Sequence, residues 1–247
     1  MPIYQHDTIV PFKESSDSKK KQVEEMFDKI AFRYDFLNRF LSAGIDVRWR
    51  KRVIKELRKL NPSTVLDVAT GTGDVAILTY KMLGTKKIIG IDISDKMLEI
   101  GNKKIERLGL KDHVELLKGD GETISFGDNS FDAVTVAFGV RNFENIEMGL
   151  LEIKRVLRSG GKLVILEFTK PTIPVIKSVY NFYLKLIAPR IGTIISKNKN
   201  AYQYLNDSVQ KFPEREMFID ILNKHGYKNT SFKTLSLGIC SIYCGEK

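Results

Sequence analysis

The residues whose types and spacing best suggest chemistry are two acids, Asp67 and Asp92, on either side of a glycine turn at residues 71–73. An apolar run at residues 65–68 leads into that turn, and a helical pattern begins at Asp74. Glycines between a strand and a helix let the backbone approach a ligand closely. An acid at the end of the next apolar run, where Asp92 stands, can accept hydrogen bonds from a ribose diol. The pattern therefore predicts a nucleoside cofactor.

Two cofactor classes fit this turn. Residues 71–76 satisfy the G-x-G-x-x-[GA] pattern of dinucleotide-binding proteins, so an NAD enzyme is one interpretation. Asp67, however, lies inside the first strand, and Asp120 follows the third strand, where it can meet an adenine edge. An adenosyl ligand without a pyrophosphate needs ribose and adenine contacts but no phosphate-binding helix terminus. These features are typical of class I S-adenosylmethionine-dependent methyltransferases.

Strand and helix signals alternate through the middle of the chain. Apolar runs predict strands at residues 65–68, 88–92, 114–117, 131–137 and 161–168, with helices at 74–83, 95–108 and 146–157. After Pro171 the alternation stops, and a helix near 214–224 precedes two strand-like runs at 230–235 and 239–244. We therefore expect an α/β, Rossmann-like methyltransferase fold: a mostly parallel seven-stranded sheet, covered on both faces, with a C-terminal antiparallel hairpin.

The sequence predicts a single domain at residues 22–247, after a mobile N-terminal arm at residues 1–21. Asp46 is expected to cap a helix that Pro62 ends, because proline cannot continue a helix. The expected parts of the domain are a helical cap at 22–60, a cofactor-binding core at 61–170, an apolar insertion at 171–210, and a C-terminal helix and hairpin at 211–247.

Composition limits the possible environment. The chain has 40 basic and 30 acidic residues, a net charge of +10, which favours anionic partners or simply a lysine-rich proteome. Cys240 and Cys244 lack the partners of a metal site and suggest a reducing compartment. The N-terminus has no signal-peptide pattern, and the apolar stretch at 178–196 carries charges and a proline. We expect a cytoplasmic protein without a metal, in which His6, His113 and His225 have no chemical role.

A wider resemblance rests on motifs outside the glycine turn. Residues 26–38 read MFDKIAFRYDFLN and residues 138–143 read FGVRNF; further matches lie at 155–161, 166–171, 202–205, 212–213 and 237–239. Over residues 22–245 the sequence resembles the quinone-biosynthesis C-methyltransferases. This resemblance implies methylation of a polyprenylated quinol by S-adenosylmethionine, with demethylmenaquinol as the main expectation. A 2-methoxy-6-polyprenyl-1,4-benzoquinol acceptor, another small-molecule methyltransferase and a non-catalytic S-adenosylmethionine-binding scaffold stay open.

The resemblance also implies roles for cofactor residues. The glycine turn would wrap the methionine end of the cofactor, Asp92 would bind the ribose, Asp120 the adenine amino group and Gly121 would offer a backbone contact. Asp67 would position the turn through backbone donors or reach the methionine amino group. The expected cofactor-binding residues are Gly71, Thr72, Gly73, Asp92, Asp120 and Gly121.

Arg141 and Asn142 are the expected catalytic residues, since they follow the fourth strand at the edge where open α/β sheets bind substrate. A guanidinium stays protonated, so Arg141 is expected to stabilise a phenolate or orient a water, while Asn142 fixes a ring oxygen. The alternative is a purely structural pair between Arg141 and a carboxylate. Tyr34, Asp35 and Glu167 are weaker candidates for substrate contact or proton acceptance.

The sequence departs from the family pattern at three positions. Thr70 stands where the family usually has glycine, and Ala137 where many members carry a serine that contacts the cofactor. Gly121 replaces a common alanine. A hydrogen bond at residue 137 is therefore expected to be absent.

The insertion is too apolar for an ordinary surface segment. We expect it to form a tunnel or membrane-facing groove for a polyprenyl tail, with Lys177, Lys185 and Lys197 near anionic headgroups, which would make the protein peripheral on the inner face of the membrane. Core packing or a homodimer interface is the alternative. A nucleic-acid substrate is not expected, because residues 137–140 lack the Asn/Asp-Pro-Pro-aromatic signature and neither cysteine suits a nucleophile.

Overall fold

One seven-stranded sheet organises the chain, with strand order β3-β2-β1-β4-β5-β7-β6. The computed structural model describes residues 4–182 and 199–247. β7 runs antiparallel to both neighbours, and the other pairings are parallel. The predicted fold class is confirmed. The strands are β1 Thr64–Val68, β2 Lys87–Asp92, β3 Val114–Lys118, β4 Phe131–Ala137, β5 Leu157–Phe168, β6 Lys228–Leu235 and β7 Cys240–Glu246.

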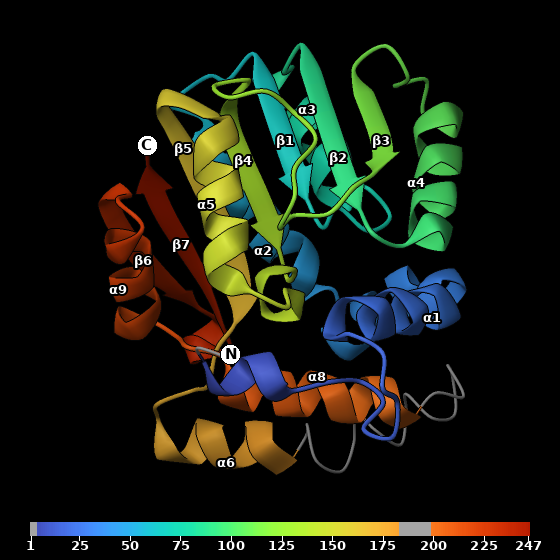
Figure 1. The fold of residues 1–247 in the computed structure, drawn as a ribbon, viewed down its shortest axis with the longest axis vertical. Coiled ribbons are helices and arrows are strands. Elements are labelled where there is room, and N and C mark those ends of the chain that lie inside the picture. The colour runs from blue at the N-terminus through green and yellow to red at the C-terminus, as the bar shows by residue number, and fades with distance from the viewer. Residues whose placement is uncertain (1–3, 183–198) are drawn as a thin grey trace.

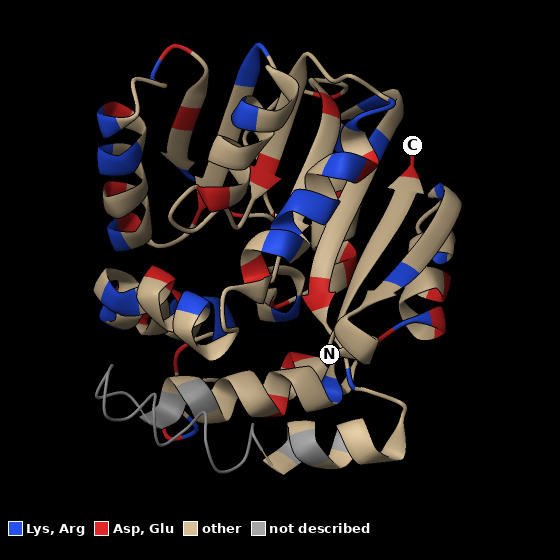
Figure 2. Cartoon of the chain, turned by 180° about the vertical axis from the view of Figure 1, so that it is seen from behind, with Lys and Arg blue, Asp and Glu red and all other residues tan. Residues whose placement is uncertain are grey.

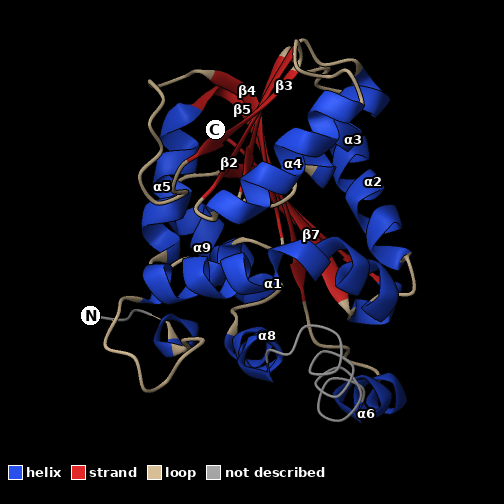
Figure 3. Ribbon diagram, turned by 90° about the vertical axis from the view of Figure 1, so that its right-hand side faces the viewer, coloured by secondary structure: helices blue, strands red, loops and turns tan. Residues whose placement is uncertain are grey.

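Helices cover both faces of the sheet, which Figure 3 shows edge-on. One buried apolar cluster joins α2, α3 and α4 to the sheet, and a second joins α5 and α9 to the opposite face. The helices are α1 Lys19–Leu41, α2 Ile45–Leu57, α3 Asp74–Leu83, α4 Asp95–Arg107, α5 Ile146–Val156, α6 Pro174–Phe182, α8 Lys199–Lys211 and α9 Glu216–Lys224, with short 3-10 turns η1 Gln5–Thr8, η2 Val140–Asn142 and η4 Ser236–Gly238.

The carboxyl ends of the parallel strands face α1, η1, α8 and α6, which lie below the sheet in Figure 1. Ligands of open parallel sheets bind at this edge, so these segments are placed to enclose a site. α2 starts two residues earlier than predicted, because Gly44, in a left-handed conformation with φ 75°, is its N-cap in place of Asp46. The prediction that Asp46 caps this helix is therefore wrong. Asp46 lies in the first turn and pairs with Arg39 and Arg50.

The sequence predicted a mobile arm at residues 1–21, and the structure describes this segment from Tyr4 onward. The described residues from Tyr4 onward contact the body of the protein: the Tyr4 hydroxyl donates to Glu147 at 2.8 Å, and His6 is fully buried. α1 begins at Lys19, inside the expected arm, because Ser18 caps the helix by accepting from the Lys21 N–H.

The apolar insertion is only partly described. α6 and α8 belong to it, while Lys185 and Lys197 lie outside the described residues, as does the side chain of Lys177. In the described part of the chain, no helix combines the length and apolarity that crossing a membrane requires.

Candidate functional site

The glycine turn presents its backbone to a cavity at the ends of β1, β2 and β4. Ala69 and Gly71 take left-handed conformations, with φ 53° and 57°. A Cβ atom on Gly71 would meet only Tyr34 Cε1, at 3.9 Å, so the turn is open on that side. Ala69 is not a glycine, and left-handed conformations of such residues cluster at functional sites.

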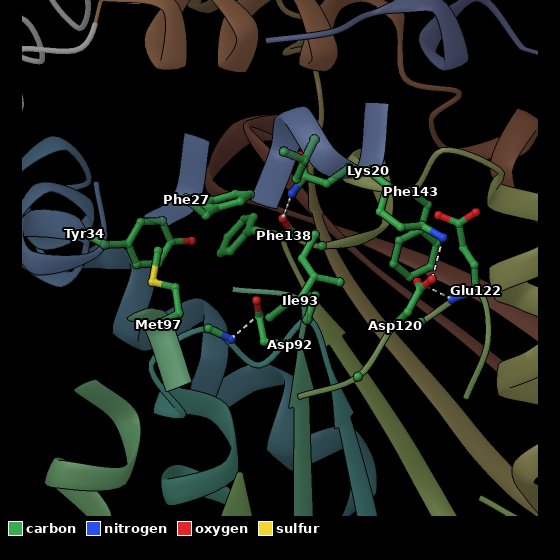
Figure 4. A pocket seen from close by; sticks show the side chains of 18 residues that line it. Lys20, Phe27, Tyr34, Asp92, Ile93, Met97, Asp120, Glu122, Phe138 and Phe143 are labelled. Atoms are coloured by element: carbon green, nitrogen blue, oxygen red, sulfur yellow. Dashed lines mark hydrogen bonds and ion pairs between the residues drawn. The ribbon is translucent and has the colours of Figure 1, made fainter. Parts of the chain in front are cut away.

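This strand-end cavity is bounded by the sheet edge below and by α1 above, as Figure 4 shows. Its described lining residues are Lys20, Val23, Phe27, Tyr34, Ala69, Gly71, Asp92, Ile93, Met97, Gly119, Asp120, Gly121, Glu122, Ala137, Phe138, Gly139, Asn142 and Phe143. Of the predicted cofactor residues, Gly71, Asp92, Asp120 and Gly121 are brought together here. Thr72 and Gly73 do not line the cavity.

Asp92 has the acceptor set expected of a ribose-binding acid. Its Oδ2 accepts from the Gly71 N–H at 2.7 Å, and its Oδ1 accepts from the Ser94 N–H at 2.9 Å. A carboxylate offers about four acceptor positions, so capacity remains for a ligand hydroxyl. Burial raises the pKa of Asp92 to about 6.

Asp120 and Gly121 occupy the far side of the cavity. Asp120 pairs with Lys20 of α1 at 2.5 Å and accepts from the Glu122 N–H at 2.9 Å. A Cβ atom on Gly121 would lie 2.7 Å from Val68 Cγ1 and 2.8 Å from Phe143 Cζ. The alanine common at this position in the family would therefore require Phe143 to move.

Asp67 accepts hydrogen bonds from side-chain hydroxyl groups, whereas the sequence suggested backbone donors. It accepts from Thr70 Oγ1 at 2.5 Å and from Thr135 Oγ1 at 2.6 Å, and it is buried outside the lining of the cavity. Burial raises its pKa to about 6. Thr70, the departure from the family glycine, thus supplies one of the two donors to this acid.

Thr72 and Asp35 take part in an ionic clasp between α1, the glycine turn and α4. Thr72 Oγ1 donates to Asp35 at 2.6 Å. Lys104 Nζ lies 2.8 Å from Thr72 Oγ1, 2.5 Å from Asp35 and 3.0 Å from Asp74. Asp35 was expected as a weaker candidate for substrate contact or proton acceptance. In the structure it links α1 to the glycine turn.

A second cavity, of about 410 Å³ and largely apolar, adjoins the strand-end cavity. Its described lining residues are Met26, Phe27, Ile30, Tyr34, Leu37, Asn38, Leu41, Ser42, Ala43, Ile45, Asp46, Trp49, Arg50, Phe138, Arg141, Phe168, Ile176, Tyr180, Ala201, Tyr204, Leu205, Ser236 and Ile239. Phe27, Tyr34 and Phe138 line both cavities, so an aromatic wall separates them.

Arg141 borders the apolar cavity and is paired with Glu167. Its Nη1 lies 2.8 Å from Glu167 Oε1 and donates to the Phe138 carbonyl at 2.6 Å. Glu167 is fully buried, which agrees with the structural alternative for Arg141. Among the described residues, however, the buried Arg141 Nε has no hydrogen-bond partner. Such an N–H costs stability unless something accepts its hydrogen bond.

Asn142 lies across the wall from its neighbour, in the strand-end cavity. Its Nδ2 donates to the Phe138 carbonyl at 3.3 Å, and its Oδ1 accepts from the Tyr204 hydroxyl at 3.1 Å. Tyr204 itself lines the apolar cavity, and burial raises its pKa. The two predicted catalytic residues therefore face different cavities, linked through Tyr204.

Several site residues were not predicted from the sequence. Lys20 and Tyr204 come from α1 and α8, which meet the sheet edge only through tertiary packing. Lys19 is buried and donates from Nζ to the carbonyls of His6 at 3.1 Å and Arg141 at 3.4 Å. Loss of solvation lowers the pKa of Lys19 to about 8. Within residues 4–182 and 199–247, no three His, Cys, Asp or Glu side chains gather as metal ligands.

The comparisons with known proteins agree with this geometry. The model of the ubiE/COQ5 methyltransferase family matches residues 15–247. The chain belongs to this family. It is 43% identical over 245 residues to a demethylmenaquinone methyltransferase of Bacteroides fragilis, covering 99% of each chain. It is also 44% identical over 230 residues to a ubiquinone/menaquinone biosynthesis C-methyltransferase of Geotalea daltonii, covering 93% of this chain and 97% of the relative.

Solved structures support the fold of this family member. A possible histamine N-methyltransferase of Thermotoga maritima gives a TM-score of 0.61 at 20% identity, covering 90% of this chain and 99% of the other. A putative S-adenosylmethionine-dependent methyltransferase of Methanococcus maripaludis gives 0.58 at 21%, covering 96% and 97%. A [4+2]-cyclase gives 0.60 at 16%, covering 92% and 96%. The fold therefore does not determine the reaction, which has to be argued from the site.

Proposed function

We propose that this chain transfers a methyl group from S-adenosylmethionine to a ring carbon of a polyprenylated quinol, with demethylmenaquinol as the acceptor. The observation that carries the proposal is the pair of adjoining cavities: one bordered by Asp92 and Asp120, the other large and apolar, with a shared aromatic wall. Relatives at 43% and 44% identity are named for quinone methylation.

The residues that line the strand-end cavity match the polar groups of S-adenosylmethionine. Gly71 is open toward the cavity, Asp92 keeps acceptor capacity for ribose hydroxyls, and Asp120 keeps capacity for an amino group beside its pair with Lys20. When bound, the cofactor supplies an electrophilic methyl group on a sulfonium sulfur. The aromatic wall would keep water from the reacting atoms, and its rings offer π-faces to a cation.

Arg141 would act on the acceptor. A hydroquinone becomes nucleophilic at a ring carbon when a base takes the proton of its hydroxyl, and the guanidinium of Arg141, which lines the apolar cavity, can donate to the resulting phenolate. Glu167 does not line either cavity, so its role would be to hold the guanidinium in place. Tyr204 and Asn142 connect the two cavities and would orient the ring against the wall.

Two further features of the function belong to this proposal. The apolar lining from α6 and α8 would take the start of the prenyl tail, so the enzyme would work as a peripheral protein at a membrane. The relative names include both naphthoquinol and benzoquinol pathways, and we favour demethylmenaquinol because the B. fragilis relative matches 99% of the chain.

Methyl transfer from isotope-labelled S-adenosylmethionine tests the proposal. The acceptors are chemically reduced demethylmenaquinone with a short tail, a benzoquinol analogue and bulk tRNA. We expect label on a ring carbon of the naphthoquinol. Label on the benzoquinol alone would show that the acceptor is a benzoquinol and not demethylmenaquinol. Cofactor binding without methyl transfer to any quinol would refute the proposed enzymatic function.

Arg141→Lys, compared with Arg158→Lys, tests the role of the guanidinium. We expect Arg141→Lys to lower kcat about 100-fold with an unchanged dissociation constant for the cofactor, because one charge-stabilising donor is lost. Arg158 is half-exposed and pairs with Asp132 away from the site, so its variant is expected to keep full activity. Equal kcat in both variants would remove Arg141 from the mechanism.

A further inference from the structure

The outer side of α1 exposes a row of phenylalanines. Phe32, Phe36 and Phe40 follow one another at four-residue spacing and therefore lie on one side of the helix. Their exposed fractions are 91%, 58% and 54%, and the rings of Phe36 and Phe40 stack with centroids 5.9 Å apart. Three large exposed aromatic residues in a row are unusual on a soluble surface and mark a site of interaction.

The next helix in the chain, α2, exposes positive charge. Arg48, Lys51, Arg52 and Lys55 are exposed on α2, and in the described part of the chain none of their side chains makes an ion pair or hydrogen bond. Figure 2 shows Lys and Arg repeated along α2, which lies in front of the sheet in that view.

Two of the basic residues on α4 are arranged differently from those on α2. Lys103 pairs with Glu99 and Lys104 with Asp35, so their charges are balanced within the protein. The charges on α2 have no such partners, and the intervening Glu56 is occupied by Lys233 at 2.9 Å. The exposed side of α2 is therefore an uncompensated cationic surface.

The turn between α1 and α2 borders the apolar cavity, and we call this turn the cavity mouth. Ala43 and Ile45, in the turn between α1 and α2 and at the start of α2, line the cavity and are themselves exposed. Phe40 precedes this turn and Arg48 follows it by one helical turn. A ligand that enters here would pass between the aromatic row and the first of the basic side chains.

We propose that Phe32, Phe36 and Phe40 of α1 and Arg48, Arg52 and Lys55 of α2, which we call the α1–α2 face, dock on an anionic lipid bilayer. The phenylalanines enter the interface between headgroups and acyl chains, the basic residues contact lipid phosphates, and the cavity mouth opens toward the acyl chains. The inference rests on the proposed function and identifies a route by which a lipid-soluble acceptor reaches the cavity.

The combination of residue types favours a bilayer over a nucleic acid. A basic helix alone could bind the phosphates of a lipid or of a nucleic acid, because both attract it through their negative charge. The neighbouring row of phenylalanines, each with no polar tip, fits acyl chains, whereas a nucleic-acid backbone would leave it in water. The cavity mouth between the two groups has an apolar lining, as an entrance for a prenyl chain requires.

Sedimentation with vesicles of phosphatidylcholine, with and without phosphatidylglycerol, tests the docking surface. We expect the full chain to prefer the anionic vesicles at least tenfold and to lose the preference in high salt. Reversal of three charges (Arg48→Glu, Arg52→Glu, Lys55→Glu) is expected to weaken binding at least 100-fold, since each basic residue near the surface strengthens binding about fivefold. Phe32→Ser with Phe36→Ser and Phe40→Ser is expected to weaken binding at least tenfold.

The matched control reverses three exposed basic residues elsewhere: Lys86→Glu, Arg107→Glu and Lys228→Glu. It changes the net charge by the same amount and is expected to bind within threefold of the wild type. Equal loss in this control, an absence of binding by the wild type, or tighter binding to bulk tRNA than to anionic vesicles would overturn the proposal.

Activity on a soluble acceptor separates this inference from the proposed function. Both surface variants are expected to methylate a short-tailed quinol in detergent-free solution at the wild-type rate, and to lose at least tenfold in rate on a long-tailed quinol in vesicles. Inactivity of the wild type on the soluble quinol would refute the proposed function alone. The vesicle-binding measurements would still test whether the α1–α2 face docks on the bilayer.

Discussion

At the scale of single residues, the site depends on buried ionisable side chains, each of which has an ion-pair partner or several hydrogen-bond donors. Arg141 and Glu167 form one such pair at the end of β4 and β5. Asp67 and Asp92 are each held by two donors at the ends of β1 and β2. Burying these groups is costly, so their partners decide whether the site is stable.

Removal of one member of the Arg141–Glu167 pair should destabilise the fold. Arg141→Met leaves the fully buried Glu167 without its cation, and we expect a loss of about 3–5 kcal/mol in the free energy of unfolding, measured by urea denaturation. Arg141→Met with Glu167→Gln should recover most of that loss. Arg158→Met, at an exposed pair, should change stability by less than about 1 kcal/mol. No recovery in the double variant would contradict this account.

The two buried acids predict a pH dependence of stability. The pKa of Asp67 is about 6 in the folded protein and 3.8 for the free side chain, so between these pH values the folded state binds more protons than the unfolded state. The free energy of unfolding should therefore fall as pH rises from about 4 to about 6, by about 2–3 kcal/mol per acid. Asp67→Asn should remove the Asp67 part of the slope in denaturation series across that range. An unchanged slope would show that Asp67 does not titrate there.

At the scale of elements, α1 is the helix that brings the site together. It contacts α4 through the Lys104 clasp, places Lys20 on Asp120 and supplies two of the three rings of the aromatic wall. Its contribution could not be predicted from the motif in residues 26–38 alone, because each contact joins residues far apart in the chain.

Loosening the clasp should weaken cofactor binding. Lys104→Met removes the cation between Asp35 and Asp74, so these carboxylates lose their shared partner and α1 is held less firmly over the glycine turn. We expect the dissociation constant of S-adenosylhomocysteine, measured by calorimetry, to rise about tenfold, since a hydrogen bond to a charged group is worth about 1.5–3 kcal/mol. Lys103→Met, which removes an exposed pair with Glu99 on the same helix, should leave it unchanged. A similar rise in both variants would argue against a specific clasp.

The strands were the most predictable elements, and their apolar runs explain why. Residues 65–68 and 131–137 were expected as strands and match β1 and β4 closely, because a strand buried on both faces reads as a continuous apolar run. The side chains around them were less predictable. The hydroxyl of Thr72 donates to Asp35, and Tyr204 enters the site from α8; neither contact was predicted. Such contacts depend on how helices pack over the sheet edge, which residue spacing does not encode.

At the scale of the whole molecule, ligand binding should stabilise the fold. A ligand that binds only the folded state at 100 times its dissociation constant adds about 2.7 kcal/mol, which for a chain of this size raises Tm by about 5–10 °C. We expect S-adenosylhomocysteine to produce this shift in calorimetry. Asp92→Ala should abolish most of it, because the variant lacks the carboxylate that we propose as the ribose acceptor. A full shift in that variant would place the ligand elsewhere.

The shared aromatic wall has a thermodynamic consequence. Phe27 and Tyr34 belong to α1, and Phe138 follows β4, so the helix and the sheet each supply part of one partition. A ligand that orders α1 from either cavity fixes the surface that the other ligand meets. The cofactor and the quinol therefore do not bind independently. If the bound cofactor changes the affinity for the quinol by some factor, the bound quinol must change the affinity for the cofactor by the same factor. The three shared rings would carry this coupling free energy.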